Sequence, residues 1–177
     1  SGNAMGAERH ELDQAGAGLF LSYYGADCCP SIRNCTLRGN CAYYGGATYI
    51  VGAAPEFVNC TFLNNAAVEG GAIRTSAWRG QWFESTREFA IKGCLFVGNY
   101  ARSCGGAIHR GPGSQCRVEG SRFTGNVAGT GGAIWCYYGA DITNCLFTHN
   151  MAKNAGGALY FGWTTALSIA SCTFFGN

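Results

Sequence analysis

The sequence has little charge and little proline. Only 12% of its 177 residues are charged, and it contains 3 prolines. Helical bundles need many Glu, Lys, Leu and Ala, so this profile argues against an α-helical fold. The 12 basic and 10 acidic residues are scattered, and without a basic run we expect no binding to nucleic acid. No apolar run approaches the roughly 20 residues that cross a bilayer, so we expect no membrane span.

Motifs for metals and cofactors are also missing. The chain has 11 cysteines and 3 histidines but no Cys-x-x-Cys pair and no Cys/His cluster, which argues against a zinc site. The acidic residues are dispersed, whereas calcium-dependent lyases need clustered acids. We therefore expect no metal ion and no cofactor.

Glycine is abundant, with 28 residues, and it marks an internal repeat. Gly-Gly-Ala recurs with a mostly aliphatic residue after it, and Cys-x-Phe/Leu recurs with Asn three residues later. The first motif begins at Gly45, Gly70, Gly105, Gly131 and Gly156. The Phe/Leu positions of the second are Leu37, Phe62, Phe96, Phe123, Phe147 and Phe174, with spacings of 25, 34, 27, 24 and 27. A common period near 25 residues predicts a solenoid of stacked coils.

The apolar segments of each repeat are too short for helices, and their alternation is typical of strands. The residue before each Cys position mostly tolerates a left-handed backbone, which predicts a sharp bend; these are Asn34, Asn59, Gly93, Gly120, Asn144 and Ser171. Each coil should then run strand, bend, strand, Asn corner, loop, Gly-Gly, strand. We predict an all-β fold, a right-handed single-stranded parallel β-helix (solenoid) of about six to seven coils.

Stacked coils bring equivalent residues into columns about 4.8 Å apart. The predicted inner columns are the Phe/Leu positions, the Thr48/Ile73/Ile108/Ile134/Leu159 positions, and a ladder of Cys35, Cys60, Cys94, Ser121, Cys145 and Cys172. We expect the ladder cysteines to be buried and reduced. A sixfold Asn column should form side-chain hydrogen bonds up the stack; it contains Asn40, Asn65, Asn99, Asn126, Asn150 and Asn177.

The repeat also suggests how the chain is divided. Residues 1–5 are typical of a cleaved expression tag, residues 6–14 form a predicted N-terminal cap, and residues 15–177 form the β-helix domain. The last residue falls at an Asn corner, where an open coil edge would normally be capped. We expect either a solenoid that continues in a longer protein or an end-to-end oligomer.

Gly-Gly-Ala-Ile together with Phe-x-x-Asn resembles the repeat of the chlamydial polymorphic outer membrane proteins, and more broadly bacterial right-handed β-helix proteins with a pectate lyase-like fold. The matching motifs span roughly residues 15–177. The resemblance implies a β-helix passenger or surface domain, often adhesive, at the bacterial cell surface or outside the cell. The matching residues belong to core and turns, and the cysteine-rich composition departs from the family pattern.

Six cysteines lie outside the ladder. Cys104 and Cys116 flank one strand and are therefore candidates for a local disulfide. Cys28 or Cys29 could reach Cys41 one coil on. Such bridges would fit an exported protein.

The residue after each Gly-Gly-Ala-Ile should face outward, because side chains alternate along a strand. That column, with a long insertion at 76–88, predicts a binding strip at Tyr49, Arg74, Trp78, His109, Trp135 and Tyr160. Its aromatic rings would stack on the sugars of a polysaccharide, and Arg74, His109 and Arg110 would suit acidic sugars. Cross-strand packing is the alternative explanation for an aromatic column, and we favour it over binding.

Three functions follow as hypotheses. The first is a non-catalytic, exported or cell-surface module that binds glycan or another host or cell-surface ligand, as an adhesin does. The second is a polysaccharide-active lyase or hydrolase, although paired carboxylates near one site are not evident in the sequence. The third is a structural solenoid spacer.

Overall fold

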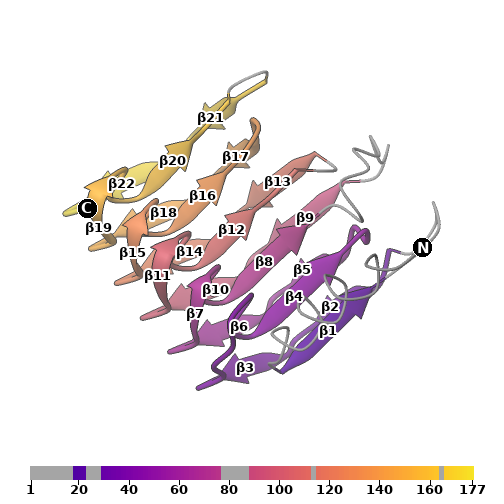
Figure 1. Cartoon of the computed structure of the whole chain (residues 1–177). Helices are drawn as coiled ribbons and strands as arrows, with labels where there is room; N and C mark the ends of the chain where they lie inside the picture. Colours follow the sequence, from indigo (N-terminus) through magenta and orange to yellow (C-terminus); the bar gives the residue numbers. More distant parts are fainter. Residues whose placement is uncertain (1–17, 23–28, 77–87, 113–114, 164–165) are drawn as a thin grey trace, which may run out of the picture.

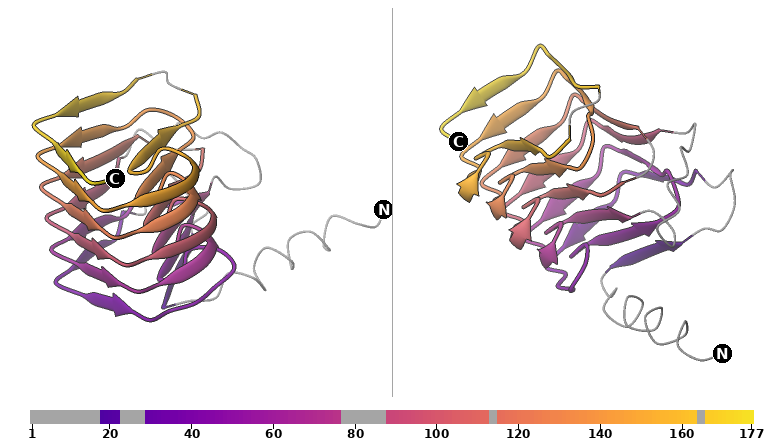
Figure 2. Two further views of the ribbon diagram at one scale, coloured as in Figure 1. Left: turned by 90° about the vertical axis from the view of Figure 1, so that its left-hand side faces the viewer. Right: turned by 45° about the horizontal axis from the view of Figure 1, so that its top comes forward.

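The chain forms a parallel β-helix in which short strands coil around a single axis (Figure 1). The computed structural model describes residues 18–22, 29–76, 88–112, 115–163 and 166–177. Figure 2 shows the coils stacked one on another, with the N-terminal coil at one end and the C-terminal coil at the other.

The strands form four parallel sheets, one for each side of the coil. Sheet A follows the Gly-Gly-Ala motifs and contains β1 (Leu19–Ser22), β4 (Thr48–Val51), β8 (Ile73–Ser76), β12 (Ile108–Arg110), β16 (Ile134–Cys136) and β20 (Leu159–Phe161). Sheet B contains β2 (Ser31–Arg33), β5 (Glu56–Val58), β9 (Phe89–Lys92), β13 (Cys116–Glu119), β17 (Asp141–Thr143) and β21 (Ser168–Ala170). Sheet C contains β3 (Thr36–Arg38), β6 (Thr61–Leu63), β10 (Leu95–Val97), β14 (Arg122–Thr124), β18 (Leu146–Thr148) and β22 (Thr173–Phe175). Sheet D contains β7 (Ala66–Glu69), β11 (Tyr100–Cys104), β15 (Val127–Thr130) and β19 (Met151–Ala155).

Sheet D corrects the prediction that a loop joins the Asn corner to Gly-Gly. Its strands pair in parallel, but the register shifts within β11 and β15. These irregularities and the many Ala and Gly residues hide the two-residue alternation that marked the other strands. The coil count is also smaller than predicted, at about five turns. In the part of the chain that the structure describes, no helix is long and apolar enough to cross a membrane.

The predicted bends are confirmed. All six residues before the Cys positions have a positive φ, between 52° and 59°. A second series of left-handed residues precedes the Asn column; it contains Gly39, Asn64, Gly98, Gly125, His149 and Gly176. Ten of these twelve bend positions hold Asn or Gly, the residues that adopt a left-handed backbone at lowest cost, and the other two hold Ser171 and His149.

Stacked rings fill the interior. Neighbouring rings of the Phe column from Phe62 to Phe174 lie 4.6–4.9 Å apart and within 8° of parallel. The aliphatic column is buried from Thr48 through Ile134. Cys60, Cys94, Ser121 and Cys145 are buried as predicted, while Cys35 at the first coil is exposed. Burial raises the pKa of Cys94 to about 12 and that of Cys145 to about 11, so these thiols stay protonated.

The Asn column forms the predicted ladder. Asn126, for example, donates from Nδ2 to Asn150 Oδ1 at 2.9 Å and to the Phe96 carbonyl at 3.1 Å. Its Oδ1 accepts from the backbone N and the Nδ2 of Asn99 at 3.0 and 2.9 Å. One side chain thus satisfies polar groups in the coils on both sides, which explains why Asn occupies a position with no exposed surface.

Candidate binding site between sheets D and A

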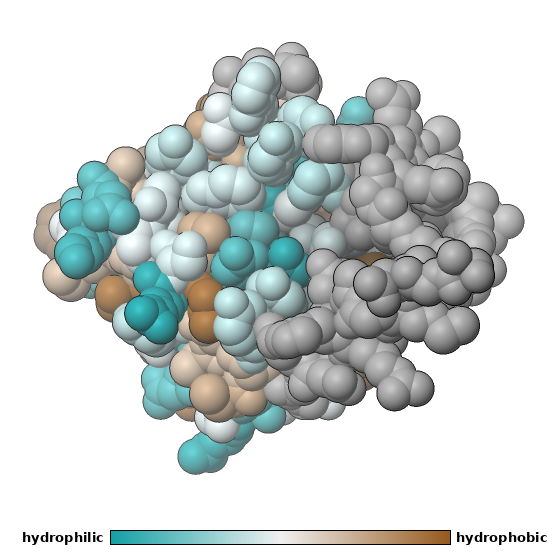
Figure 3. Space-filling model, in the orientation of Figure 1, coloured by the Kyte–Doolittle hydropathy of each residue, from teal (hydrophilic) through white to brown (hydrophobic). Residues whose placement is uncertain are grey.

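A groove runs along the outer angle between sheets D and A. Its volume is about 470 Å³, within the usual range for small-ligand sites. Figure 3 shows this face, where pale and hydrophilic residues surround a few strongly hydrophobic ones. We call it the D–A groove, and its lining comprises Tyr43, Val68, Arg102, Ser103, Cys104, Gly129, Thr130, Trp135 and Asn154.

Unequal strand lengths account for the hollow. β11 and β19 each have five residues, whereas β15 between them has four. Arg102 and Ser103 belong to β11, and Asn154 belongs to β19. Gly129 belongs to β15, which lies between these two strands in sheet D. A Cβ at Gly129 would come within 2.5 Å of the Ser103 carbonyl oxygen, so a larger residue would intrude there. Bulges of this kind often re-aim side chains at binding sites.

The predicted outward column exists, but it is not an open strip. The register joins Tyr49, Arg74, His109, Trp135 and Tyr160 on neighbouring strands of sheet A. Tyr49 is 2% exposed and His109 is 7% exposed, and neither is part of the main hydrophobic cluster of the core. Neighbouring side chains therefore cover the column at these two positions, and the binding strip stays a prediction. Trp78 lies outside the described residues.

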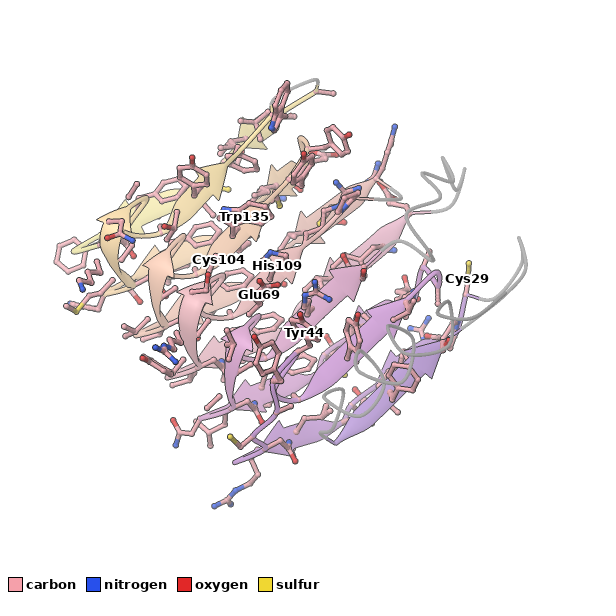
Figure 4. All side chains as sticks on the ribbon, viewed as in Figure 1. Cys29, Tyr44, Glu69, Cys104, His109 and Trp135 are labelled. Atoms are coloured by element: carbon pink, nitrogen blue, oxygen red, sulfur yellow. The ribbon has the colours of Figure 1, made fainter. Side chains whose placement is uncertain are left out.

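Arg74 is held in a cage. Its Nε donates to Glu69 Oε2 at 2.8 Å, and an Nη donates to the Tyr49 hydroxyl at 2.9 Å. The guanidinium also lies 3.9 Å from the centre of the Tyr44 ring, a cation–π distance. Figure 4 shows Tyr44 and Glu69 on the same face as the groove. Because these partners satisfy Arg74, it is a poor candidate for binding the acid group of a sugar.

His109 lies next along the column and stacks on Trp135. Their ring centres are 4.5 Å apart and the planes differ by 4°. Tyr160 lies near Trp135 from the next strand, at 6.4 Å and 10°. The column rings therefore face one another along the helix axis, so sugar rings cannot stack on them as the sequence suggested.

The charge on His109 also differs from the expectation. Burial, and then the positive charge of Arg74, lower its pKa to about 3, so the ring is neutral at physiological pH. Its Nε2 is 3.8 Å from Glu69 Oε2, and its buried Nδ1 has no hydrogen-bond partner among the described residues. Arg110, the third predicted cation, is only 3% exposed, because the alternation of β12 turns it inward. None of the three predicted cations is thus presented to an acidic sugar.

Cys104 belongs to the groove and raises the question of nucleophilic chemistry. It pairs in register with Glu69, and it precedes His109 by the same five residues that separate Glu69 from Arg74. Burial raises the pKa of Cys104, whereas that of His109 is lowered. A catalytic Cys–His pair needs the opposite shifts, which favour thiolate and imidazolium. The electrostatics of this corner do not activate the thiol.

The described cysteines of the predicted pairs are free thiols in this structure. Cys104 lies on the outside of sheet D, whereas Cys116 is buried inside sheet B, and both are free thiols. Cys29 precedes β2 of sheet B, and Cys41 bridges to Ala66 of β7; these two are also free. Figure 4 shows Cys29 apart from the other labelled residues. Cys28 lies outside the described residues. Within the described residues, no group of three or more His, Cys, Asp or Glu side chains is placed to hold a metal ion.

Comparison with known proteins defines the family. The family model described as "right handed beta helix region" matches residues 7–177. The chain belongs to this right-handed β-helix family. No curated protein and no solved structure matches it significantly. The comparison supports the broader part of the resemblance, a parallel β-helix repeat, while the specific outer membrane repeat remains a prediction.

Sequence reasoning missed most of the groove. Arg102, Ser103, Thr130 and Asn154 come from sheet D, the segment predicted as a loop. The available signal was the distance from Asn to the next Gly-Gly, which is six residues from Asn99 to Gly105 and from Asn150 to Gly156 but five in the other coils. Of the predicted strip residues that the structure describes, only Trp135 lines the groove.

Proposed function

We propose that this β-helix is a non-catalytic, exported or cell-surface module that binds an acidic glycan in the D–A groove. The supporting observation is the groove itself, which brings an exposed aromatic ring, an arginine and several hydrogen-bonding groups around about 470 Å³. Carbohydrate sites commonly combine apolar ring contacts with a few placed polar groups, and this lining has both.

Tyr43 is the best-placed ring for contact with a sugar. It is 44% exposed and packs at right angles on Tyr44, with ring centres 4.7 Å apart. Tyr44 in turn contacts the guanidinium of Arg74. The Tyr43–Tyr44 pair is therefore fixed in place by Arg74 and its partners. Trp135 can offer only its edge, because its neighbours occupy its faces.

Arg102 supplies the charge that selects an acidic ligand. It is exposed and lines the groove, and it forms no ion pair within the described part of the chain. A planar guanidinium suits the two oxygens of a sugar carboxylate. Ser103, Thr130 and Asn154 are placed to contact hydroxyl groups.

Binding is favoured over hydrolysis by the distribution of carboxylates. Glycosidases use two carboxyl groups on either side of the bond that they cleave. No carboxylate lines the groove among the described residues, and nearby Glu69 is engaged by Arg74. A structural spacer would need no such groove and would bind no ligand.

A glycan array with matched acidic and neutral saccharides tests the proposal, followed by calorimetric titration of the strongest acidic saccharide. Arg102→Ala should weaken binding at least tenfold, since a charged hydrogen bond contributes about 1.5–3 kcal/mol. Tyr43→Ala should also weaken it. The matched controls are Arg122→Ala, on sheet C, and Tyr100→Ala, an exposed tyrosine outside the groove lining.

Three results would refute the proposal. An array with no binding would leave the spacer role. Equal losses for Arg102→Ala and Arg122→Ala would move any binding site elsewhere. Release of shortened products from the acidic saccharide would show an enzyme instead.

A further inference from the structure

One position in sheet D recurs along the helix axis and changes its chemistry from coil to coil. In strands β7, β11, β15 and β19, which lie side by side (Figure 1), it is the residue that follows an alanine near the start of the strand. In the coil before β7 it belongs to Tyr43, whose carbonyl oxygen accepts a hydrogen bond from the Val68 backbone N. Over five successive coils the position holds Tyr43, Val68, Arg102, Gly129 and Lys153.

The two strands that flank β15 pair with it in the same irregular way. Between the pairs made by Val127 and Thr130, β15 has two residues, whereas β11 and β19 each have three. Arg102 and Lys153 are the middle residues of these two bulged segments. Because neighbouring strands lie about 4.8 Å apart, the two cationic positions are separated by about 10 Å along the axis.

The residue between the two cations has no side chain. A Cβ at Gly129 would clash with the backbone of β11. Arg102 and Lys153 are both exposed, and neither forms an ion pair with any described residue. The four strands of sheet D contain a single acidic residue, Glu69, which is engaged by Arg74. Sheet D therefore presents two positive charges that the described carboxylates leave uncompensated.

We propose that Arg102 and Lys153 bind two acid groups of one linear glycan, which lies along the helix axis and carries uronic acids on alternate sugars. This inference rests on the proposed function and specifies its ligand. The length of one linked sugar ring is close to the spacing between coils, so acids on alternate sugars recur at the spacing of the two cations. Tyr43 lies two coils from Arg102 on the other side, where it meets a ring further along the same chain.

The two cations contribute differently. The planar guanidinium of Arg102 binds both oxygens of a carboxylate in a fixed orientation, whereas the ammonium of Lys153 is a point charge on a flexible stem. Since an exposed ion pair contributes little, the loss of the Lys153 charge should weaken binding about three- to fivefold. Lys153 therefore makes affinity depend on the length of the glycan.

Titration calorimetry of the full chain with hyaluronan oligosaccharides tests the proposal. The disaccharide carries one uronic acid, and the tetrasaccharide carries two on alternate sugars. A tetrasaccharide whose carboxyl groups have been reduced to alcohols is the uncharged control. The parent protein should bind the tetrasaccharide about fivefold more tightly than the disaccharide, and the uncharged control most weakly.

Variants then separate the two cations. Lys153→Met should weaken binding of the tetrasaccharide about three- to fivefold and leave that of the disaccharide unchanged, because a single acid group stays at Arg102. A folding defect would weaken both. Lys153→Arg should keep the parent affinity, and Arg102→Ala should weaken both ligands. The matched control is Lys92→Met, which removes the other lysine of the sequence, on sheet B, and should bind the tetrasaccharide as the parent does.

The outcomes distinguish this inference from the proposed function. If Lys153→Met left the tetrasaccharide affinity unchanged, or weakened both ligands equally, while Arg102→Ala still weakened binding, the second cation would be overturned and the proposed function would stand. Binding only of saccharides with acids on adjacent sugars would overturn the alternate pattern. A parent protein that bound no acidic saccharide would overturn both.

Discussion

Replacing Asn126 by alanine should be among the most destabilising single changes in this protein. Asn126 has no exposed surface, and its side chain makes four hydrogen bonds across two coil interfaces. The alanine variant leaves the Asn99 backbone N–H and the Phe96 carbonyl without this side-chain partner. Each buried polar group left unpaired costs about 1–3 kcal/mol. The free energy of unfolding should therefore fall by about 3–5 kcal/mol, measured by urea denaturation.

The end of the ladder provides the control. Asn40 is half-buried, and its side chain donates one hydrogen bond, to Asn65 Oδ1 at 2.9 Å. Asn40→Ala should lower the free energy of unfolding by only about 1 kcal/mol. Asn126→Asp should be at least as damaging as Asn126→Ala, because its second oxygen would face the Phe96 and Asn150 acceptors. Equal losses for Asn126→Ala and Asn40→Ala would refute the ladder as a source of stability.

Two further predictions concern buried positions. His109 has a pKa of about 3 when folded and 6.5 in its ordinary state, so only the unfolded chain takes up its proton between these values. Stability should fall on acidification below pH 6.5, by about 2–3 kcal/mol at pH 4.5. Thermal melts of His109→Gln should lack this component, whereas His149→Asn should keep it; equal pH slopes in all three proteins would contradict a neutral buried His109. Gly132→Ala should lower the free energy of unfolding by about 3 kcal/mol or more, because the added Cβ would clash with the Gly157 carbonyl oxygen. At Gly125 an added Cβ meets no neighbour, but φ is +62°, so Gly125→Ala should lower the free energy of unfolding by only about 1–2 kcal/mol. Urea denaturation that ranked the two variants in the reverse order would contradict the stacking geometry.

The repeat sequence predicted the features that depend on position in the coil. Asn59 and Gly93 marked left-handed bends because few residues adopt that backbone. The Phe and Asn columns followed from equal spacing, since stacking carries one residue onto its equivalent in the next coil. These properties are local or periodic, so the sequence contains them directly.

The groove depends on departures from the repeat. The extra residue in β11 shifts the register and exposes Arg102 and Ser103 beside Gly129. Arg110 turns inward where other coils have an uncharged residue, although its charge suggested a surface position. Contacts between different parts of the coil, such as that of Arg74 with the Tyr44 ring, require the shape of the whole coil and carry no sequence spacing of their own.

The location of a bound acidic saccharide tests the binding account most directly. A crystal structure of the protein with the strongest acidic ligand from the array should show the sugar ring against Tyr43 and its carboxylate at Arg102. Ligand density on another face of the solenoid, or an empty D–A groove at saturating ligand, would contradict the account.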